Sequence, residues 1–233
     1  MKIQPSSLFF EVTRRCNMNC EHCLRGDAQC KDMDKAIVDK TLDHVSRIDT
    51  LVLTGGEPTL NLDLCRYIFE EIRRRKIPLG EFFIATNGKD HQMELTKLLL
   101  EILPYVENLD LCGVSISTDV FHDPISPSPV KYLSIYQNWK ENGDYRNYTG
   151  LLKRGRAAEN YGDYATERSI SMDLYPADSY DETIQLEGDL YITAEGLICA
   201  DCDLPYDLQE TCKVGDVDQF DQLLEQLWKE VNT

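Results

Sequence analysis

The sequence predicts an α/β fold in which strand–helix units repeat around a parallel sheet, followed by a C-terminal hairpin and helix. The first observation is a set of four short apolar runs with the length and composition of buried strands, at residues 8–12, 51–54, 82–85 and 114–117. The second is that helix-period segments lie between these runs. Alternation of the two periods is typical of a parallel sheet with crossover helices.

Apolar residues between the predicted strands recur at helical spacing and place one apolar face on each of three helices. These faces carry Val38, Leu42 and Val45, then Leu64, Ile68 and Ile72, then Leu95, Leu99 and Ile102. Pro78 and Pro104 lie just past two of these helices, where a proline ends a helix. Three helices of this kind would cover the sheet between its first four strands.

The pattern weakens beyond about residue 123, and only residues 170–174 resemble another parallel strand. Residues 189–193 and 197–199 flank a turn-like segment and predict a hairpin. Val217, Phe220, Leu224, Leu227 and Val231 predict a final amphipathic helix. We therefore expect a core over residues 1–185 and an extension over residues 186–233.

Length and charge narrow the class of protein. A chain of 233 residues suits one compact domain with small additions. The net charge of -17 argues against nucleic acid or an anionic membrane as the main partner, because both attract basic proteins. The chain starts without a signal-peptide core, so its nine cysteines predict metal or redox ligands in a reducing cytoplasm.

Three cysteines, Cys16, Cys20 and Cys23, lie in one short segment directly after the first predicted strand. Three thiolates can bind three irons of a 4Fe–4S cluster and leave the fourth iron open. A small molecule with an amine and a carboxylate could chelate that iron. The alternative is a zinc site in which His22 completes the three thiolates.

The segment Gly55-Gly56-Glu57-Pro58 follows the second predicted strand and precedes a helix. It should lie at the carboxyl edge of the sheet, where parallel sheets bind ligands. Two glycines let the backbone approach a ligand, and Glu57 could pair with an ammonium group or orient the loop.

The cysteine triplet and the Gly-Gly-Glu-Pro segment together resemble the radical S-adenosylmethionine (SAM) superfamily, over at least residues 8–119. The resemblance implies a partial (β/α)6 TIM-like barrel, a 4Fe–4S cluster and SAM as cofactors, and an electron donor such as flavodoxin or ferredoxin. It implies that Gly55, Gly56 and Glu57 contact the amino group of SAM. His22 stands where the family has an aromatic residue that contacts the adenine.

Later strand ends offer further cofactor contacts. Thr86 and Asn87 end the third predicted strand, and a simple turn is the alternative. Ser115, Ser117 and Asp119 alternate along the fourth strand and beyond it, so they could reach the ribose of SAM, as polar residues do there in the family. Arg156 lies in a Gly-Arg segment that resembles one contacting the SAM carboxylate, and a solvated basic turn is the alternative.

The remaining cysteines are of two kinds. Cys30, Cys65 and Cys112 are isolated, and a lone cysteine is more often a small apolar residue than a ligand. Cys199, Cys202 and Cys212 include a Cys-x-x-Cys pair and resemble, imperfectly, the auxiliary-cluster extensions of some peptide-modifying radical SAM enzymes. A second cluster, a zinc site and ordinary thiols all remain open for them.

The resemblance implies reductive cleavage of SAM to a 5′-deoxyadenosyl radical that abstracts hydrogen from a substrate. A peptide, a glycyl-radical enzyme to be activated, or a small molecule could be that substrate. A non-catalytic zinc or redox-sensing module is the alternative from a different class.

Overall fold

The computed structural model describes residues 1–137 and 150–232. Its first part consists of β1 (Lys2–Thr13), α1 (Lys35–Asp43), β2 (Ile48–Gly55), α2 (Leu62–Arg75), β3 (Leu79–Thr86), α3 (Gln92–Ile102), β4 (Gly113–Ile116) and β5 (Tyr136–Gln137). Its second part consists of α4 (Gly155–Tyr161), β6 (Tyr175–Tyr180), β7 (Thr183–Ile192), β8 (Leu197–Cys199), α5 (Tyr206–Gln209), β9 (Lys213–Asp216) and α6 (Phe220–Val231). Short 3-10 helices lie at Pro58–Asn61, Leu103–Tyr105, Leu109–Leu111, Pro129–Tyr132 and Val217–Gln219.

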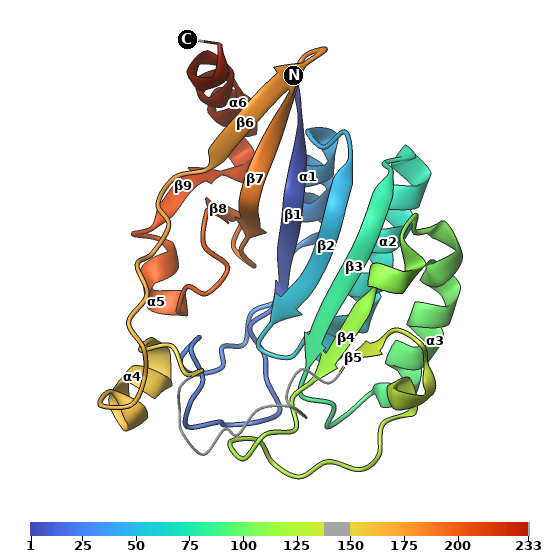
Figure 1. Ribbon diagram of the computed structural model, residues 1–233, viewed down its shortest axis with the longest axis vertical. Helices are drawn as coiled ribbons and strands as arrows, with labels where there is room; N and C mark the ends of the chain where they lie inside the picture. Colours follow the sequence, from blue (N-terminus) through green and yellow to red (C-terminus); the bar gives the residue numbers. More distant parts are fainter. Residues whose placement is uncertain (138–149, 233) are drawn as a thin grey trace.

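The strands form one mixed sheet in the order β5-β4-β3-β2-β1-β7-β8-β9, with β6 also paired to β7 (Figure 1). Neighbours from β5 to β7 along this order pair in parallel, and β6, β8 and β9 pair antiparallel. The four strands predicted at residues 8–117 are confirmed, as are the three helices between them.

The α/β class is therefore confirmed, whereas a six-unit barrel is not. The described residues contain three consecutive strand–helix units, then β4 and β5 joined by a segment whose one helical turn is of the 3-10 type. The path of the sheet ends at β5 on one side and β9 on the other.

The prediction of a parallel strand at residues 170–174 is wrong. These residues form no strand, and the strand that follows, β6, runs antiparallel to β7. The alternation of Ile170, Met172 and Leu174 resembles a strand, but Met172 is 45% exposed and only Leu174 enters the main core. The parallel neighbour that the chain does supply is β7, which pairs with β1.

The helices begin and end for local reasons. Asp34 caps α1 by accepting a hydrogen bond from the backbone nitrogen of Ala36 at 2.8 Å. Helix α2 ends at Lys76 in the left-handed conformation, and three arginines in its last turn complement the helix dipole. No helix in residues 1–137 or 150–232 combines the length and apolar character needed to cross a membrane.

The predicted hairpin and C-terminal helix are confirmed as β7–β8 and α6. A buried polar network holds this part of the chain against β1. The carboxylate of Glu11, fully buried in β1, accepts hydrogen bonds from the Tyr191 hydroxyl at 2.6 Å and the Gln209 amide at 2.7 Å. It also accepts from Arg14 at 2.7 Å and from the backbone of Ala194 at 3.1 Å. The C-terminal part thereby lies directly beside the loop that follows β1.

Candidate cofactor site

The cysteine triplet lies in the loop after β1, at the edge of the sheet toward which the carboxyl ends of β1–β4 point (Figure 1). Cys16, Cys20 and Cys23 are all half-buried and unpaired. Burial, together with the neighbouring thiols of Cys16 and Cys23, raises the pKa of Cys20 to about 11. The three thiols therefore share one small region, and a metal that binds them must displace their protons.

The glycine pair packs on the backbone of this loop. The amide of Gly56 donates to the carbonyl of Thr13 at 2.8 Å, and that of Glu57 donates to Arg15 at 2.8 Å. A Cβ on Gly55 would lie 2.1 Å from the Thr13 oxygen, and one on Gly56 would lie 2.4 Å from the Arg15 oxygen. Neither glycine position has room for a Cβ, because the backbone of residues 13–15 packs directly against both. The amides of Gly56 and Glu57 are already hydrogen-bonded to that backbone.

Glu57 connects the end of β2 to the end of β3. Its side chain is 1% exposed and accepts hydrogen bonds from the Thr59 hydroxyl at 2.6 Å, the Thr86 hydroxyl at 2.7 Å and the Asn87 amide at 2.7 Å. Burial raises the pKa of Glu57, and these hydrogen bonds oppose that rise. Of the two roles predicted for Glu57, orientation of the loop is the one visible in the contacts.

Asn87 carries this network to the first cysteine. Its side-chain amide donates to the Asn17 side chain at 2.8 Å and contacts the sulfur of Cys16 at 3.8 Å. The structure thus brings Glu57, Thr86 and Asn87 together with the cysteine loop, and Thr86 serves the network through Glu57.

Helix α4 covers the other end of the loop. The backbone nitrogen of Arg156 donates to the carbonyl of Cys23 at 2.9 Å, and a Cβ on Gly155 would lie 2.7 Å from that oxygen. The Arg156 guanidinium contacts Asn19, and its Nε is buried without a hydrogen-bond partner in the described part of the chain. Arg156 therefore lies against the cysteine loop, with its side chain only 14% exposed.

The comparison with family models finds the Radical SAM superfamily over residues 10–153. The chain belongs to the radical SAM superfamily. Membership implies a 4Fe–4S cluster and SAM as cofactors, and the members of the superfamily are enzymes. The matched residues contain the cysteine loop, the glycine pair, strands β2–β4 and the end of β1.

Two relatives with similar sequences illustrate how much of this chain matches known proteins. An uncharacterized protein of Methanocaldococcus jannaschii is 36% identical over 52% of this chain and 41% of its own length. The Fe-coproporphyrin III synthase of Methanosarcina barkeri is 32% identical over 48% of this chain and 28% of its own length. The chain thus spans less than half the length of these two relatives.

A solved structure has the same fold. A histidine-tagged form of anSMEcpe with bound AdoMet matches with a TM-score of 0.52 and 14% identity, covering 91% of this chain and 78% of that chain. At this identity the likeness concerns the fold alone.

The residues of this radical SAM chain fit a SAM-bound cluster. Three thiols lie on one loop, and the buried Nε of Arg156 lacks a partner beside it. The described part of the chain contains two groups of three His, Cys, Asp or Glu ligand atoms within 4.8 Å of one another, and the cysteine triplet is in neither. Three ligands of one zinc ion would lie about 4 Å apart, so the wider arrangement favours a cluster over zinc.

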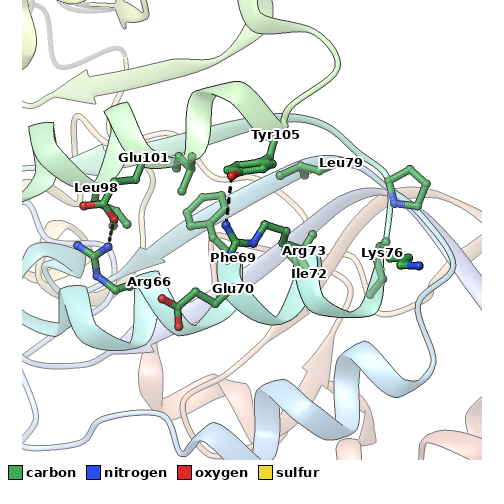
Figure 2. A pocket seen from close by; sticks show the side chains of 13 residues that line it. Arg66, Phe69, Glu70, Ile72, Arg73, Lys76, Leu79, Leu98, Glu101 and Tyr105 are labelled. Carbon is green, nitrogen blue, oxygen red and sulfur yellow. Dashed lines mark hydrogen bonds and ion pairs between the residues drawn. The ribbon is translucent and has the colours of Figure 1, made fainter.

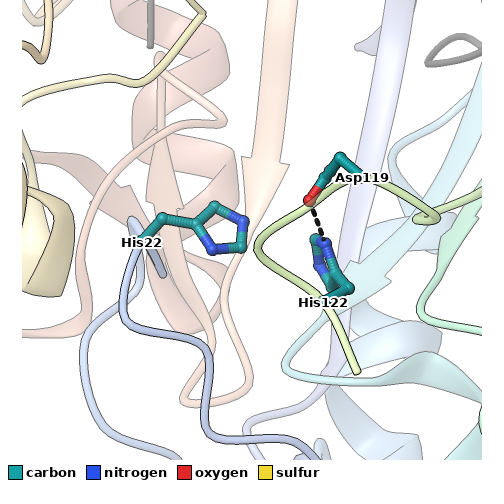
Figure 3. A group of neighbouring side chains, drawn as sticks. All are labelled: His22, Asp119 and His122. Carbon is teal, nitrogen blue, oxygen red and sulfur yellow. Dashed lines mark hydrogen bonds and ion pairs between the residues drawn. The ribbon is translucent and has the colours of Figure 1, made fainter. Parts of the chain in front are cut away.

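The ligand atoms of His22 form a close group with those of Asp119 and His122 (Figure 3) and not with the cysteines. The His22 ring lies 4.8 Å from that of Phe121 and 4.7 Å from that of His122. The carboxylate of Asp119 is 2.8 Å from Nδ1 of His122 and accepts from the Phe121 amide at 2.9 Å. The predicted adenine and ribose contacts, His22 and Asp119, therefore lie together in an aromatic environment.

The two predicted serines lie at the end of β4. Ser115 is 8% exposed, and the backbone nitrogen of Ser117 donates to Thr86 at 2.9 Å. Asp119 lies in the turn beyond the strand rather than on it.

The three C-terminal cysteines share one small apolar cluster, although their sulfur atoms form no group within 4.8 Å of one another. Cys199 and Cys212 are buried in a small apolar cluster with Tyr191 and Leu204. The group within 4.8 Å is instead Asp201, Cys202 and Asp203.

Arginines already hold the two carboxylates of that group. Arg154 donates to Asp201 at 3.2 Å, and Arg168 lies 3.1 Å from Asp201 and 2.8 Å from Asp203. A cation at this place would have to displace both guanidinium groups.

A cavity of about 280 Å³ lies elsewhere, between α2 and α3 (Figure 2). Arg66 pairs with Glu101 across it, and the Arg73 guanidinium contacts the Tyr105 hydroxyl at 3.2 Å. Lys76, Pro78 and Leu79 close it beyond the end of α2, at the start of β3. It is therefore remote from the cysteine loop, which lies at the opposite edge of the sheet.

Four further residues contact the site and were not predicted as site residues from the sequence: Asn17, Arg25, His122 and Tyr206. His122 follows Asp119 by three residues within one turn, a spacing that could have indicated the pair. Arg25 donates to the carbonyls of Cys202 and Leu204 at 2.6 Å each, a contact between distant segments that no local pattern reveals.

Proposed function

We propose that this chain is a radical SAM enzyme whose 4Fe–4S cluster is held by Cys16, Cys20 and Cys23. The bound cluster supplies one electron that cleaves SAM to methionine and a 5′-deoxyadenosyl radical, which abstracts hydrogen from a substrate. The nine unpaired cysteines suit a reducing cytoplasm, and flavodoxin or ferredoxin is the proposed electron donor.

The contact between the glycine pair and the cysteine loop carries this proposal. Two backbone hydrogen bonds of 2.8 Å and two glycines without room for a Cβ join the segment proposed for SAM to the segment proposed for the cluster. A zinc module has no need of this contact, whereas a cofactor that bridges the two segments requires their relative position to be fixed.

The other residues of the site have separate roles in binding the cofactors. Glu57 and Asn87 orient the two loops, and Arg156 places a cation beside Cys20 and Cys23 that can hold the SAM carboxylate. His22 offers a ring for the adenine, and Asp119 with Ser117 offers oxygen atoms for the ribose.

Anaerobic reconstitution tests the proposal. The wild-type protein should take up about four irons and form 5′-deoxyadenosine with SAM and dithionite. Cys16→Ala, Cys20→Ala and Cys23→Ala should each abolish that product. Cys30→Ala is the matched control, because Cys30 is an exposed cysteine of the same loop region and should retain full activity.

Formation of 5′-deoxyadenosine by any of the three alanine variants would show that the triplet is not the cluster site. A colourless protein with one zinc and no iron would favour the non-catalytic module instead.

We propose a peptide as the substrate, with a small molecule and a glycyl-radical enzyme as the alternatives. A short precursor peptide encoded beside this gene would support the peptide. Faster SAM cleavage on addition of that peptide would then test it directly, and no change in rate would contradict it.

A further inference from the structure

Tyr206, the first residue of α5, lies against both ends of the cysteine loop. Its backbone nitrogen donates to the carbonyl of Arg25 at 3.1 Å, two residues after Cys23. The Arg14 guanidinium, two residues before Cys16, lies 4.8 Å from the centre of the Tyr206 ring. The ring therefore sits beneath the loop, between the segments that enter and leave it.

The Arg25 side chain secures this position from the other direction. It donates to the carbonyls of Cys202 and Leu204, so the backbone and side chain of one residue both bind the segment that leads into α5. Tyr206 cannot move away from the loop without breaking these buried contacts.

The hydroxyl of Tyr206 has no hydrogen-bond partner within the described ranges, although the residue is only 8% exposed. A buried hydroxyl without a partner is unfavourable, so such a group indicates an acceptor that the protein atoms alone do not supply. Tyr191 provides the contrast, because it is fully buried and its hydroxyl donates to Glu11 at 2.6 Å.

Cofactor binding would add sulfur atoms as acceptors at the cysteine loop, against which Tyr206 lies. Burial raises the pKa of Tyr206, and among the charged neighbours that add to this rise are Glu11 and the thiol of Cys23. The phenol thus remains a proton donor at neutral pH and lies within electrostatic range of Cys23.

We infer that the Tyr206 hydroxyl donates a hydrogen bond to the Cys23 edge of the bound cluster and raises its reduction potential. The inference rests on the proposed function, since it requires the cluster at Cys16, Cys20 and Cys23. A donor to a cluster sulfur stabilises the reduced, more negative state more than the oxidised state. Tyr206 is a tuning residue and transfers no atom.

Redox titration of the reconstituted protein, followed by the electron paramagnetic resonance of the reduced cluster, tests this inference. In Tyr206→Phe, the ratio of reduced to oxidised cluster at a fixed potential should fall by about threefold to tenfold, the effect of one net hydrogen bond. A tenfold fall corresponds to a midpoint lower by about 59 mV. Tyr67→Phe is the control, because the Tyr67 hydroxyl bonds to Asp39 on the helical face and should leave the potential unchanged.

The apoprotein gives a second readout. Tyr206→Phe removes a hydroxyl without a partner and should leave the melting temperature unchanged or higher, whereas Tyr191→Phe should lower it.

Each result has one meaning. An unchanged potential in Tyr206→Phe overturns the inference and leaves the proposed function intact, whereas a wild-type protein that takes up no cluster overturns the proposed function. If Tyr206→Phe takes up no iron, wild-type protein with ring-deuterated tyrosine replaces it. Deuterium couplings to the reduced cluster would then support the contact, and their absence would exclude it.

Discussion

The two cysteine regions of this protein have similar sequences and different surroundings. Both contain a Cys-x-x-Cys pair, but Cys20 and Cys23 lie half-buried in a loop, whereas Cys199 is fully buried on β8. At that loop, the Asn87 amide contacts the sulfur of Cys16, and the Arg156 guanidinium has a buried nitrogen that lacks a partner in the described part of the chain. Burial raises the pKa of Cys199 to about 12, and the groups near it include the thiol of Cys212, the carboxylates of Glu11 and Asp201 and the Arg25 guanidinium.

From this difference we expect that the Cys-x-x-Cys spacing alone does not make a metal site of the C-terminal pair. A ligand loop needs partial exposure, donors for the sulfur atoms and space for the metal. The loop after β1 meets these conditions. The C-terminal region is packed as a core, and its carboxylates are bound by arginines.

Metal analysis of the Cys16, Cys20, Cys23 triple-alanine variant gives the largest expected effect. We expect all iron to be lost and no zinc to be retained, because Cys199 and Cys212 are buried in an apolar cluster and arginines already hold the neighbouring carboxylates. Iron, sulfide and zinc are measured after anaerobic reconstitution. About four irons remaining would indicate an auxiliary cluster in the C-terminal region and would contradict the difference proposed between the two cysteine regions.

Arg154→Met should destabilise the protein by about 3–5 kcal/mol, because it leaves the buried Asp201 carboxylate without its buried partner. Arg168→Met is the matched control, since Arg168 is half-exposed and its pairs should contribute about 0–1 kcal/mol. Urea unfolding measures both. If zinc restores the stability of Arg154→Met to that of the wild type, the carboxylates of this region are metal ligands after all.

Gly56→Ala should cost about 1–3 kcal/mol and reduce iron uptake, because its Cβ would lie 2.4 Å from the Arg15 carbonyl oxygen and 2.9 Å from that of Arg14. Thermal unfolding of the apoprotein and iron content after reconstitution are the measurements. Gly150→Ala, where a Cβ meets nothing within 4 Å, should change neither. Normal iron uptake by Gly56→Ala would mean that the glycine contact does not position the loop.

Cys199→Ala should have the smallest effect, a loss of about 1 kcal/mol with unchanged iron content and SAM cleavage. The reason is that Cys199 acts as a small buried apolar residue beside Tyr191. Denaturant unfolding and the 5′-deoxyadenosine assay measure the two properties. A lower iron or zinc content in Cys199→Ala than in the wild type would show that Cys199 is a metal ligand and would contradict the expectation.

The strand–helix units up to residue 117 could be predicted because each is specified by local periodicity and by the stops at Pro78 and Pro104. Strand β1 proved longer than predicted, because its beginning, residues 2–7, is mostly polar and contains Pro5, so it did not resemble a buried strand. The position of β7 beside β1 could not be predicted, because periodicity identifies a strand but not its partner.

The candidate site likewise has a part that the sequence predicts and a part that it does not. Spacing identified Cys16, Cys20 and Cys23, and the order of strand and turn placed the glycine pair near them. The contacts of Glu57 with Thr86 and Asn87 depend on two strand ends meeting, and those of Tyr206 depend on residues nearly two hundred positions apart. Such contacts follow from topology, which short-range patterns do not encode.

The pairing of β7 with β1 has a consequence for the order of assembly. Ser7 lies opposite Asp189 and Phe10 opposite Ile192, so this pairing joins segments about 180 residues apart in sequence. Contacts of such high sequence separation form slowly, because a long loop must close first. During synthesis, β1 can pair with β2 long before β7 leaves the ribosome, and its other edge then stays open. The cysteine loop therefore acquires the contacts of Arg25 with Cys202 and Leu204 only after that segment has been synthesised, and cluster insertion should follow this step.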